Sequence, residues 1–212
     1  MTETYGAKRH YQREEIAATY DNARFRGLRG RFVNQLERRL LMRSIAGLPH
    51  GALALDLPTG TGRMVRWLTE AGYRVVGTAV SLPMLGEARA LSTDAALVRG
   101  EGERLPFADK SVDAAVCFRL LSHLPRAARV AVLGELARVA RERVVAVYQP
   151  HRVAIWWLVY GLVLRKPVPR YYVSASDLEQ EFAESGLRPV RSHALLRGLF
   201  MERAYVLAPA RR

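Results

Sequence analysis

Short apolar segments alternate with amphipathic ones along the middle of this chain. The apolar segments predict strands at 52–57, 73–78, 95–99, 112–118 and 143–148. The segments between them predict helices at 63–71, 82–91 and 126–139. Strands that alternate with helices of about ten residues are typical of βαβ units, which build a parallel sheet covered by helices on both faces.

The chain outside this region follows other patterns. Residues 13–48 are expected to be helical, because Phe32, Leu36 and Leu40 recur at a spacing of four residues. The C-terminal part predicts a helix and two strands, at 176–185, 188–194 and 200–207. The predicted fold class is α/β: a Rossmann-like, doubly wound, mostly parallel sheet of seven strands, with the last two strands as an antiparallel edge hairpin and with N-terminal helices.

Composition narrows the class of protein only slightly. The chain has 212 residues, 50% of them hydrophobic, which suits one globular domain. The N-terminal segment is polar and lacks the apolar core of a secretory signal, so a cytoplasmic location is expected. Cys117 is the single cysteine, which excludes a disulfide within the chain, and its place inside an apolar strand predicts a core residue.

The net charge is +13, from 33 basic residues against 20 acidic ones. A basic excess attracts nucleic acid, anionic lipid or acidic substrates. Here the basic residues are scattered along the chain, and no aromatic platform for stacking bases is evident. No nucleic-acid partner is therefore expected.

A turn with two glycines joins the first predicted strand to the first helix. It reads Leu-Asp-Leu-Pro-Thr-Gly-Thr-Gly-Arg over residues 55–63. Gly60 and Gly62 permit close approach of the backbone to a ligand, and the helix start offers free N–H donors. Such a turn also occurs for geometric reasons alone, and it lacks the Gly-Lys-Ser/Thr ending of a phosphate-binding P-loop.

A second segment with candidate chemistry follows the third strand. It reads Val-Arg-Gly-Glu-Gly-Glu-Arg-Leu-Pro-Phe over residues 98–107. The carboxylate of Glu101 can accept a hydrogen bond from an exocyclic amine, and Leu105 and Phe107 can flank a flat ring. Taken alone, the segment would equally be a solvated acidic loop.

In this order, the two segments resemble those of class I S-adenosylmethionine-dependent methyltransferases, in particular the small-molecule, quinone-biosynthesis-like branch. The resemblance runs over residues 20–143 and implies S-adenosylmethionine (SAM) as cofactor and S-adenosylhomocysteine (SAH) as product. No metal site is expected. The single domain, residues 1–212, is expected to comprise an N-terminal helical lid, a cofactor-binding core, an apolar lid or cap, and a C-terminal helix with edge strands, at 1–48, 52–148, 151–175 and 176–208.

The resemblance also implies roles for individual residues. The residues implied to bind the cofactor are Tyr20, Asp56, Pro58, Thr59, Gly60, Gly62, Ala79, Val80, Glu101, Gly102 and Phe118. Asp56 through Gly62 would cradle the methionine end of SAM, and Glu101 would lie near the adenine amine. Arg24 and Phe25, with Tyr20, would fold over the cofactor as part of the lid.

Two positions depart from the family pattern. Pro58 stands where the family usually has its first glycine, which is tolerable if its nitrogen is not needed as a donor. Ala79 stands where the family usually has an acid that binds both ribose hydroxyls. Two lost charge-assisted bonds would weaken binding by about 2–4 kcal/mol, and Ser81 is the candidate to replace one of them. The chain would then be a weakened enzyme, a protein that has lost catalysis, or one with a substitution introduced at this position.

The acceptor is expected beside the loop after the fourth strand, since the resemblance implies that this loop faces the methyl group. His123 is the candidate general base if the acceptor arrives protonated, although a histidine here equally caps or packs the next helix. Arg119 is a candidate anchor for an acidic substrate. Tyr148 and His151, near the end of the fifth strand, are candidates to line the acceptor pocket.

An apolar stretch at residues 153–164 contains Trp156 and is flanked by basic residues. It is shorter than the about 20 residues that span a bilayer as a helix. In the family the segment after the fifth strand commonly covers the acceptor site, so Trp156 is a candidate substrate contact and a small hydrophobic molecule is the expected acceptor. A peripheral membrane contact, a homodimer face and buried packing are the alternatives.

These observations predict methyl transfer from SAM to a small, hydrophobic acceptor. The alternative is a catalytically weakened or non-catalytic methyltransferase-like binding protein, suggested by Ala79. The basic charge is the one feature that suggests methylation of RNA, because nothing in the sequence resembles the Asn-Pro-Pro-Tyr or cysteine motifs of nucleic-acid-modifying relatives.

Overall fold

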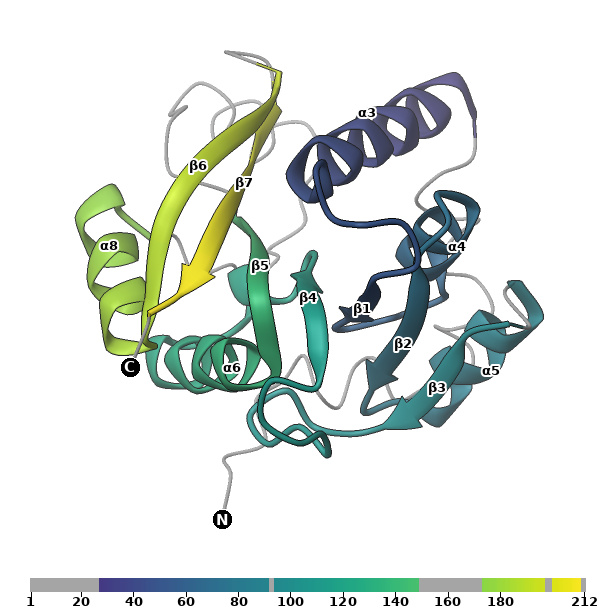
Figure 1. Cartoon of the computed structure of the whole chain (residues 1–212). Coiled ribbons are helices and arrows are strands. Elements are labelled where there is room, and N and C mark those ends of the chain that lie inside the picture. The colour runs from purple at the N-terminus through teal and green to yellow at the C-terminus, as the bar shows by residue number, and fades with distance from the viewer. Residues whose placement is uncertain (1–26, 92–93, 149–172, 197–199, 211–212) are drawn as a thin grey trace.

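The computed structural model describes residues 27–91, 94–148, 173–196 and 200–210. Their strands form one sheet of seven in the order β3-β2-β1-β4-β5-β7-β6 (Figure 1). The strands are β1 (Leu53–Asp56), β2 (Arg74–Ala79), β3 (Ala96–Arg99), β4 (Val112–Cys117), β5 (Ala140–Tyr148), β6 (Leu187–Leu196) and β7 (Phe200–Pro209). β7 pairs antiparallel with both β5 and β6, and the other neighbouring pairs are parallel. The predicted α/β fold, with its antiparallel edge hairpin, is confirmed.

Helices cover both faces of the sheet (Figure 1). They are α3 (Gly27–Ile45), α4 (Arg63–Glu70), α5 (Leu82–Leu91), the 3-10 helix η1 (Leu121–His123), α6 (Arg126–Val139) and α8 (Ala175–Glu184). α6 and α8 pack on one face, where Leu133 and Phe182 belong to one buried cluster. α3 and α4 pack on the other, where Leu40 and Leu68 belong to a second cluster.

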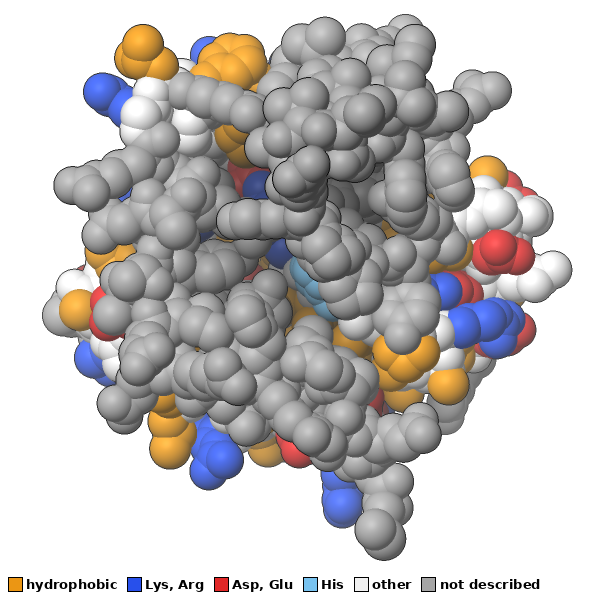
Figure 2. All heavy atoms as spheres, turned by 180° about the vertical axis from the view of Figure 1, so that it is seen from behind, with side chains coloured by type: hydrophobic (Ala, Val, Ile, Leu, Met, Phe, Trp, Pro, Cys, Tyr) orange, Lys and Arg blue, Asp and Glu red, His pale blue; other side chains and the backbone are white. Residues whose placement is uncertain are grey.

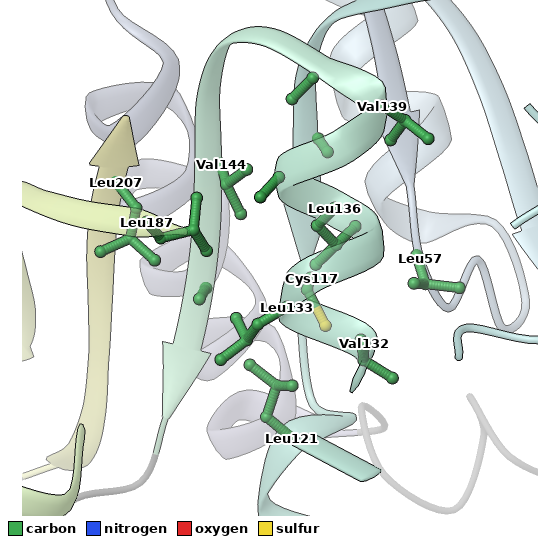
Figure 3. Close-up of a cluster of buried hydrophobic side chains, with 14 of the residues drawn as sticks. Leu57, Cys117, Leu121, Val132, Leu133, Leu136, Val139, Val144, Leu187 and Leu207 are labelled. Carbon is green, nitrogen blue, oxygen red and sulfur yellow. The ribbon is translucent and has the colours of Figure 1, made fainter. Parts of the chain in front are cut away.

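The first of these clusters lies between α6 and the centre of the sheet. Leu133 and Leu136 of α6 and Val144 of β5 are all 0% exposed, and Cys117 lies among them (Figure 3). Burial raises the pKa of the Cys117 thiol, and the charge of Asp56 adds to that shift. A neutral thiol without solvent access is a packing group, so the predicted core role of Cys117 is confirmed.

Element boundaries differ from the sequence-based expectation mainly at β5. This strand begins at Ala140, directly after α6, whereas the apolar pattern placed its start at Arg143. Ala140 already pairs with Val112 of β4, with a register shift before the next pair. The first residues of this strand are more polar and carry no apolar signal, so the pattern missed them. Of the helical segment expected at 13–48, the structure describes α3, and residues 13–26 lie outside the described residues.

The topology places the candidate site at one edge of the sheet. β1 lies between β2 and β4, so the order of the parallel strands reverses beside it. In open α/β sheets, ligands bind beyond the carboxyl ends of the strands at such a reversal. The loops after β1, β2, β3 and β4 all begin at this edge, and α3 lies between the β6–β7 hairpin and α4 (Figure 1).

The surface bears on the predictions about partners. On the face opposite to that of Figure 1, the described basic side chains lie at separate places, and one group lies beside acidic side chains (Figure 2). Several described arginines form ion pairs at the surface, such as Arg38 with Glu70 and Arg126 with Glu184. In the described part of the chain, no helix combines the length and apolar character needed to cross a membrane. The absence of a nucleic-acid partner stays a prediction.

Candidate cofactor and acceptor site

The turn after β1 is anchored to the strands on both sides. We call residues 57–62 the glycine turn. The N–H of Leu57 donates to the carbonyl of Val116 in β4 at 2.9 Å, and the N–H of Thr59 donates to the carbonyl of Thr78 in β2 at 3.0 Å. The turn is therefore held at the point where the strand order reverses, and it presents a fixed backbone to the end of the sheet.

The two glycines of this turn serve different purposes. Both have a positive φ, 54° at Gly60 and 91° at Gly62, which other residues rarely adopt. A Cβ added to Gly62 would lie 2.8 Å from the Cα of Ala88, so this glycine lets α4 approach α5. No atom of the described residues lies within 4 Å of a Cβ added to Gly60, so these residues leave the space beside it open. Only Gly60 fits the expectation of a glycine that leaves room for a ligand.

Asp56 ends β1 directly before the glycine turn and is 0% exposed. Neither of its carboxylate oxygens has a hydrogen-bond partner among the described residues. Burial raises the pKa of this carboxyl well above its ordinary value, and the positive charge of Arg63 opposes the shift. A buried acceptor without a partner is costly, and a ligand that donates hydrogen bonds or carries positive charge would remove that cost.

The end of β2 holds Ala79, which is 4% exposed and in register with Arg99 of β3. The Nε of Arg99 donates to the carbonyl of Val80 at 3.4 Å, which places a guanidinium at the end of β2. The Oγ of Ser81 accepts from the N–H of Met84 at 3.3 Å, so this hydroxyl caps the start of α5. A cationic side chain therefore lies near the position where the family usually has an acid.

A tight turn follows β3. Glu101 is exposed and forms an isolated bridge with Arg104, whose N–H donates to the Glu101 carbonyl at 3.1 Å. A Cβ on Gly102 would come within 3.2 Å of Val132 and 3.3 Å of Leu57, so the turn packs closely against its surroundings. Leu105, expected to flank a flat ring, is instead a core residue at 4% exposure. Its position beside a proline gave no signal of this burial.

The loop after β4 carries the candidate general base. Phe118 is buried directly after the strand, and η1 ends at His123. The N–H of His123 donates to the carbonyl of Leu120 at 2.8 Å, and its side chain is half-buried. This loop and the glycine turn leave the sheet from adjacent strands, so the structure brings His123 and Asp56 to the same edge.

Arg119 adopts φ 58°, in the left-handed region, and its guanidinium binds two carboxylates. Its Nη2 donates to Oε1 of Glu37 in α3 and lies 3.5 Å from Oε1 of Glu202 in β7. A guanidinium already paired with two acids is a poor anchor for an acidic substrate. Glu37 was missed by the sequence-based analysis, because its partner lies far away along the chain.

The structure places Tyr148 in the core rather than at the acceptor pocket. This residue is 1% exposed, and its hydroxyl donates to Oε2 of Glu181 in α8 at 3.3 Å. Its ring contacts those of Phe182 and Tyr205 edge-on, with centroids 6.1 and 6.0 Å away. Burial and the nearby carboxylate of Glu181 raise the pKa of this phenol. Tyr148 ends the strand with an inward-pointing side chain, which its position in the sequence did not reveal.

The remaining candidates lie outside the described residues. These are Tyr20 with Arg24 and Phe25 in the N-terminal segment, and His151 and Trp156 after β5. The described residues contain no group of three or more His, Cys, Asp or Glu side chains that could hold a metal ion. The candidate site therefore consists of the glycine turn, Asp56, and the ends of β2, β3 and β4.

The sequence that forms this edge of the sheet is similar to that of known proteins. The family described as "Methyltransferase domain" matches residues 55–147, from β1 to β5. A demethylmenaquinone methyltransferase from Beutenbergia cavernae is 32% identical over 163 residues, 74% of this chain and 66% of that protein. A malonyl-[acyl-carrier protein] O-methyltransferase from Pectobacterium atrosepticum is 34% identical over 139 residues, 62% of this chain and 51% of that protein. The chain thus spans between half and two thirds of the length of these curated relatives.

Among solved structures, the magnesium protoporphyrin IX methyltransferase from Synechocystis PCC 6803 with bound SAH shares the fold. Its TM-score is 0.74 at 16% identity, and the match covers 96% of this chain and 98% of that one. At such identity the match shows the architecture and not the substrate. Sequence and fold agree: the chain belongs to the class I S-adenosylmethionine-dependent methyltransferase family.

Proposed function

We propose that this chain transfers a methyl group from SAM to a small, hydrophobic acceptor. The observation that carries the proposal is the buried carboxylate of Asp56, which has no hydrogen-bond partner among the described residues and lies beside the space that they leave open at Gly60. A ligand with an ammonium group fits this place, because it supplies the missing donors and the missing positive charge. The amino group at the methionine end of SAM has this chemistry.

The residues present fit the rest of such a cofactor with one exception. The glycine turn offers backbone N–H groups at the start of α4, where no described side chain caps the helix. Glu101 is exposed at the edge where an adenine amine would lie, and its carboxylate has the acceptor chemistry that such an amine needs. Ala79 provides no acceptor for the ribose hydroxyls, so we expect weaker cofactor binding than an acid at this position would give.

When bound, SAM supplies a methyl group on a positively charged sulfur. The protein then has to align the acceptor, exclude water and, for a protonated acceptor, take up a proton. In this proposal the imidazole of His123 accepts that proton, since it lies on the loop after β4 at the same edge as Asp56. Phe118, buried at the start of that loop, excludes water from this side.

The acceptor class rests on separate support. The relatives named above are methyltransferases of demethylmenaquinone and of malonyl-[acyl-carrier protein], and the similar structure is that of a magnesium protoporphyrin IX methyltransferase. The apolar residues 153–164, which include Trp156, fit a hydrophobic acceptor. A cytoplasmic location with a peripheral membrane contact through this stretch would give access to such a molecule. If apolar quinone-like compounds fail to shift the melting temperature and liposomes do not bind the protein, this part of the proposal fails.

Isothermal titration of the protein with SAH tests the cofactor assignment directly. The wild type is expected to bind SAH, and Asp56→Asn is expected to bind it about 10- to 100-fold more weakly through loss of a charge-assisted bond. Asp113→Asn is the matched control, because Asp113 lies at the opposite end of the sheet, where it binds the N–H of Leu53. An unchanged SAH affinity in Asp56→Asn contradicts the proposed role of Asp56.

A further inference from the structure

A fully buried carboxylate on α3 joins two parts of the candidate site. Glu37 is 0% exposed, and its Oε2 accepts a hydrogen bond from Nη2 of Arg63 at 3.0 Å. Its Oε1 accepts a hydrogen bond from Nη2 of Arg119. Burial opposes ionisation of Glu37, but the guanidinium groups of Arg119 and Arg63 outweigh it and hold its pKa below the ordinary value. The three side chains therefore form one charged cluster.

The two arginines come from different loops. Arg63 is the first residue of α4 and directly follows the glycine turn. Its charge also acts on Asp56, and its guanidinium lies 5.3 Å from the centre of the Trp67 ring. Arg63 therefore binds the carboxylate of Glu37 and also acts through its charge on Asp56, at the end of β1 that would receive the cofactor.

Arg119 belongs to the loop that leads to His123. Its φ of 58° is a backbone conformation that residues other than glycine rarely adopt. Such a conformation persists only where the surroundings hold it. Arg119 forms ion pairs with Glu37 of α3 and Glu202 of β7. These two carboxylates hold the loop after β4 in its conformation.

We propose that Glu37 is a positioning residue of the active site. By binding Arg63 with one oxygen and Arg119 with the other, it fixes the glycine turn and the loop after β4 relative to each other. The inference rests on the proposed methyl transfer, in which one loop holds the cofactor and the other carries the base. Glu37 itself touches neither reactant in this proposal, and it acts through the two arginines.

The test compares Glu37→Gln, Arg119→Gln and their double variant with the wild type. Arg38→Ala is the matched control. Arg38 is the next residue of α3 and pairs with Glu70 of α4 at 2.9 Å, but both side chains of this pair are half-exposed at the surface. Two quantities are measured well below each melting temperature: the dissociation constant for SAH, and hydrogen exchange of the amides in residues 57–63 and 118–123.

Glu37→Gln is expected to weaken SAH binding about tenfold, because a displaced glycine turn would lose about one hydrogen bond to the ligand. Glu37→Gln should also raise the rate of hydrogen exchange in both loops. The double variant should show SAH affinity and exchange rates close to those of either single variant, since all three variants remove the same link. Arg38→Ala should change neither quantity. If Glu37→Gln lowers only the melting temperature, with affinity and exchange as in the wild type, the inference is wrong.

Two further outcomes are decided by the same design. If Glu37→Gln does not fold, Arg119→Gln carries the test, because Glu37 keeps its bond to Arg63 there. Unchanged exchange in residues 57–63 of that variant would overturn the link between the loops. If the wild type binds no SAH, the proposed function fails, whereas the exchange measurement still decides whether Glu37 couples the two loops.

Discussion

The carboxylate of Asp56 links stability to ligand binding at a single residue. Because its folded-state pKa lies above its ordinary value, the ionised group destabilises the ligand-free protein at neutral pH, and this penalty disappears as the pH falls. Asp56→Asn is therefore expected to raise the free energy of unfolding of the ligand-free protein by about 1–3 kcal/mol. Thermal melts with and without SAH check this. A variant that melts lower without SAH and keeps the stabilisation by SAH would contradict it.

A substitution at Ala79 is expected to tighten SAH binding, whereas Asp56→Asn is expected to weaken it. Ala79→Asp returns an acceptor to the end of β2 and is expected to tighten SAH binding by at least about tenfold. Arg99 lies in register beside it and would pair with the new carboxylate, which limits the gain. Ala79→Asn is the control, with similar shape and no charge, and should gain less. Equal or weaker binding by Ala79→Asp, measured by calorimetry, would show that the ribose is held in another way.

Single residues show where sequence reasoning reaches its limit. The glycine turn was found from the sequence, but the open space at Gly60 and the close approach of Ala88 to Gly62 follow only from packing. Tyr148 was placed at the end of its strand correctly, yet its side chain points inward to Glu181. The direction in which the last side chain of a strand points depends on neighbours that local patterns do not record.

At the scale of elements, most of the fold was predictable because short apolar strands and glycine turns are local signals. The spacing of Phe32, Leu36 and Leu40 predicted a helix, and in α3 Leu36 and Leu40 are buried, whereas Phe32 is half-exposed. Glu37 lies on the same helix and is buried as well, through Arg119, which is 82 residues away. No local pattern reveals that partner, which is why the link between the loops was missed.

The middle of α6 offers a prediction about an element. Gly134 lies inside this helix, and a Cβ added there would meet no atom of the described residues within 4 Å. Alanine has a higher helix propensity than glycine, so Gly134→Ala is expected to stabilise the protein by about 0.5–1 kcal/mol. Chemical denaturation checks this value. Gly62→Ala is the contrasting variant and should destabilise strongly, because its Cβ would collide with the backbone of Ala88.

α6 and α8 are joined by a buried ion pair that makes a further prediction. Arg129, 5% exposed, donates from Nε to both carboxylate oxygens of Glu181 at 3.1 and 3.0 Å, and from Nη1 to the carbonyl of Leu124 at 2.8 Å. Arg129→Met would leave the carboxylate buried without its charge partner, which is expected to cost about 3–5 kcal/mol. Urea unfolding measures this cost. A loss below about 1 kcal/mol, the value of a surface pair, would contradict it.

For the whole molecule, acid sensitivity follows from the carboxylates that are paired. The pKa of Glu37 is lowered below 4.5, and that of Asp113 is lowered below 3.8 by the N–H of Leu53 and by Arg141. A lowered folded-state pKa gives stability that is present above the ordinary value and is lost as the pH falls through the folded value. The free energy of unfolding should therefore decrease below about pH 4.5 in the wild type and less steeply in Glu37→Gln. Equal slopes for both proteins would contradict the charged state of Glu37.

At the edge of the sheet where β1 ends, we propose that the turn at Gly60 and the carboxylate of Asp56, which has no partner among the described residues, form a cofactor site. Calorimetric titration of the wild type with SAH, alongside Asp56→Asn, tests it most directly. Saturable binding of one SAH per wild-type chain is expected, with an affinity about 10- to 100-fold lower in the variant. Failure of the wild type to bind SAH at millimolar concentration would contradict it.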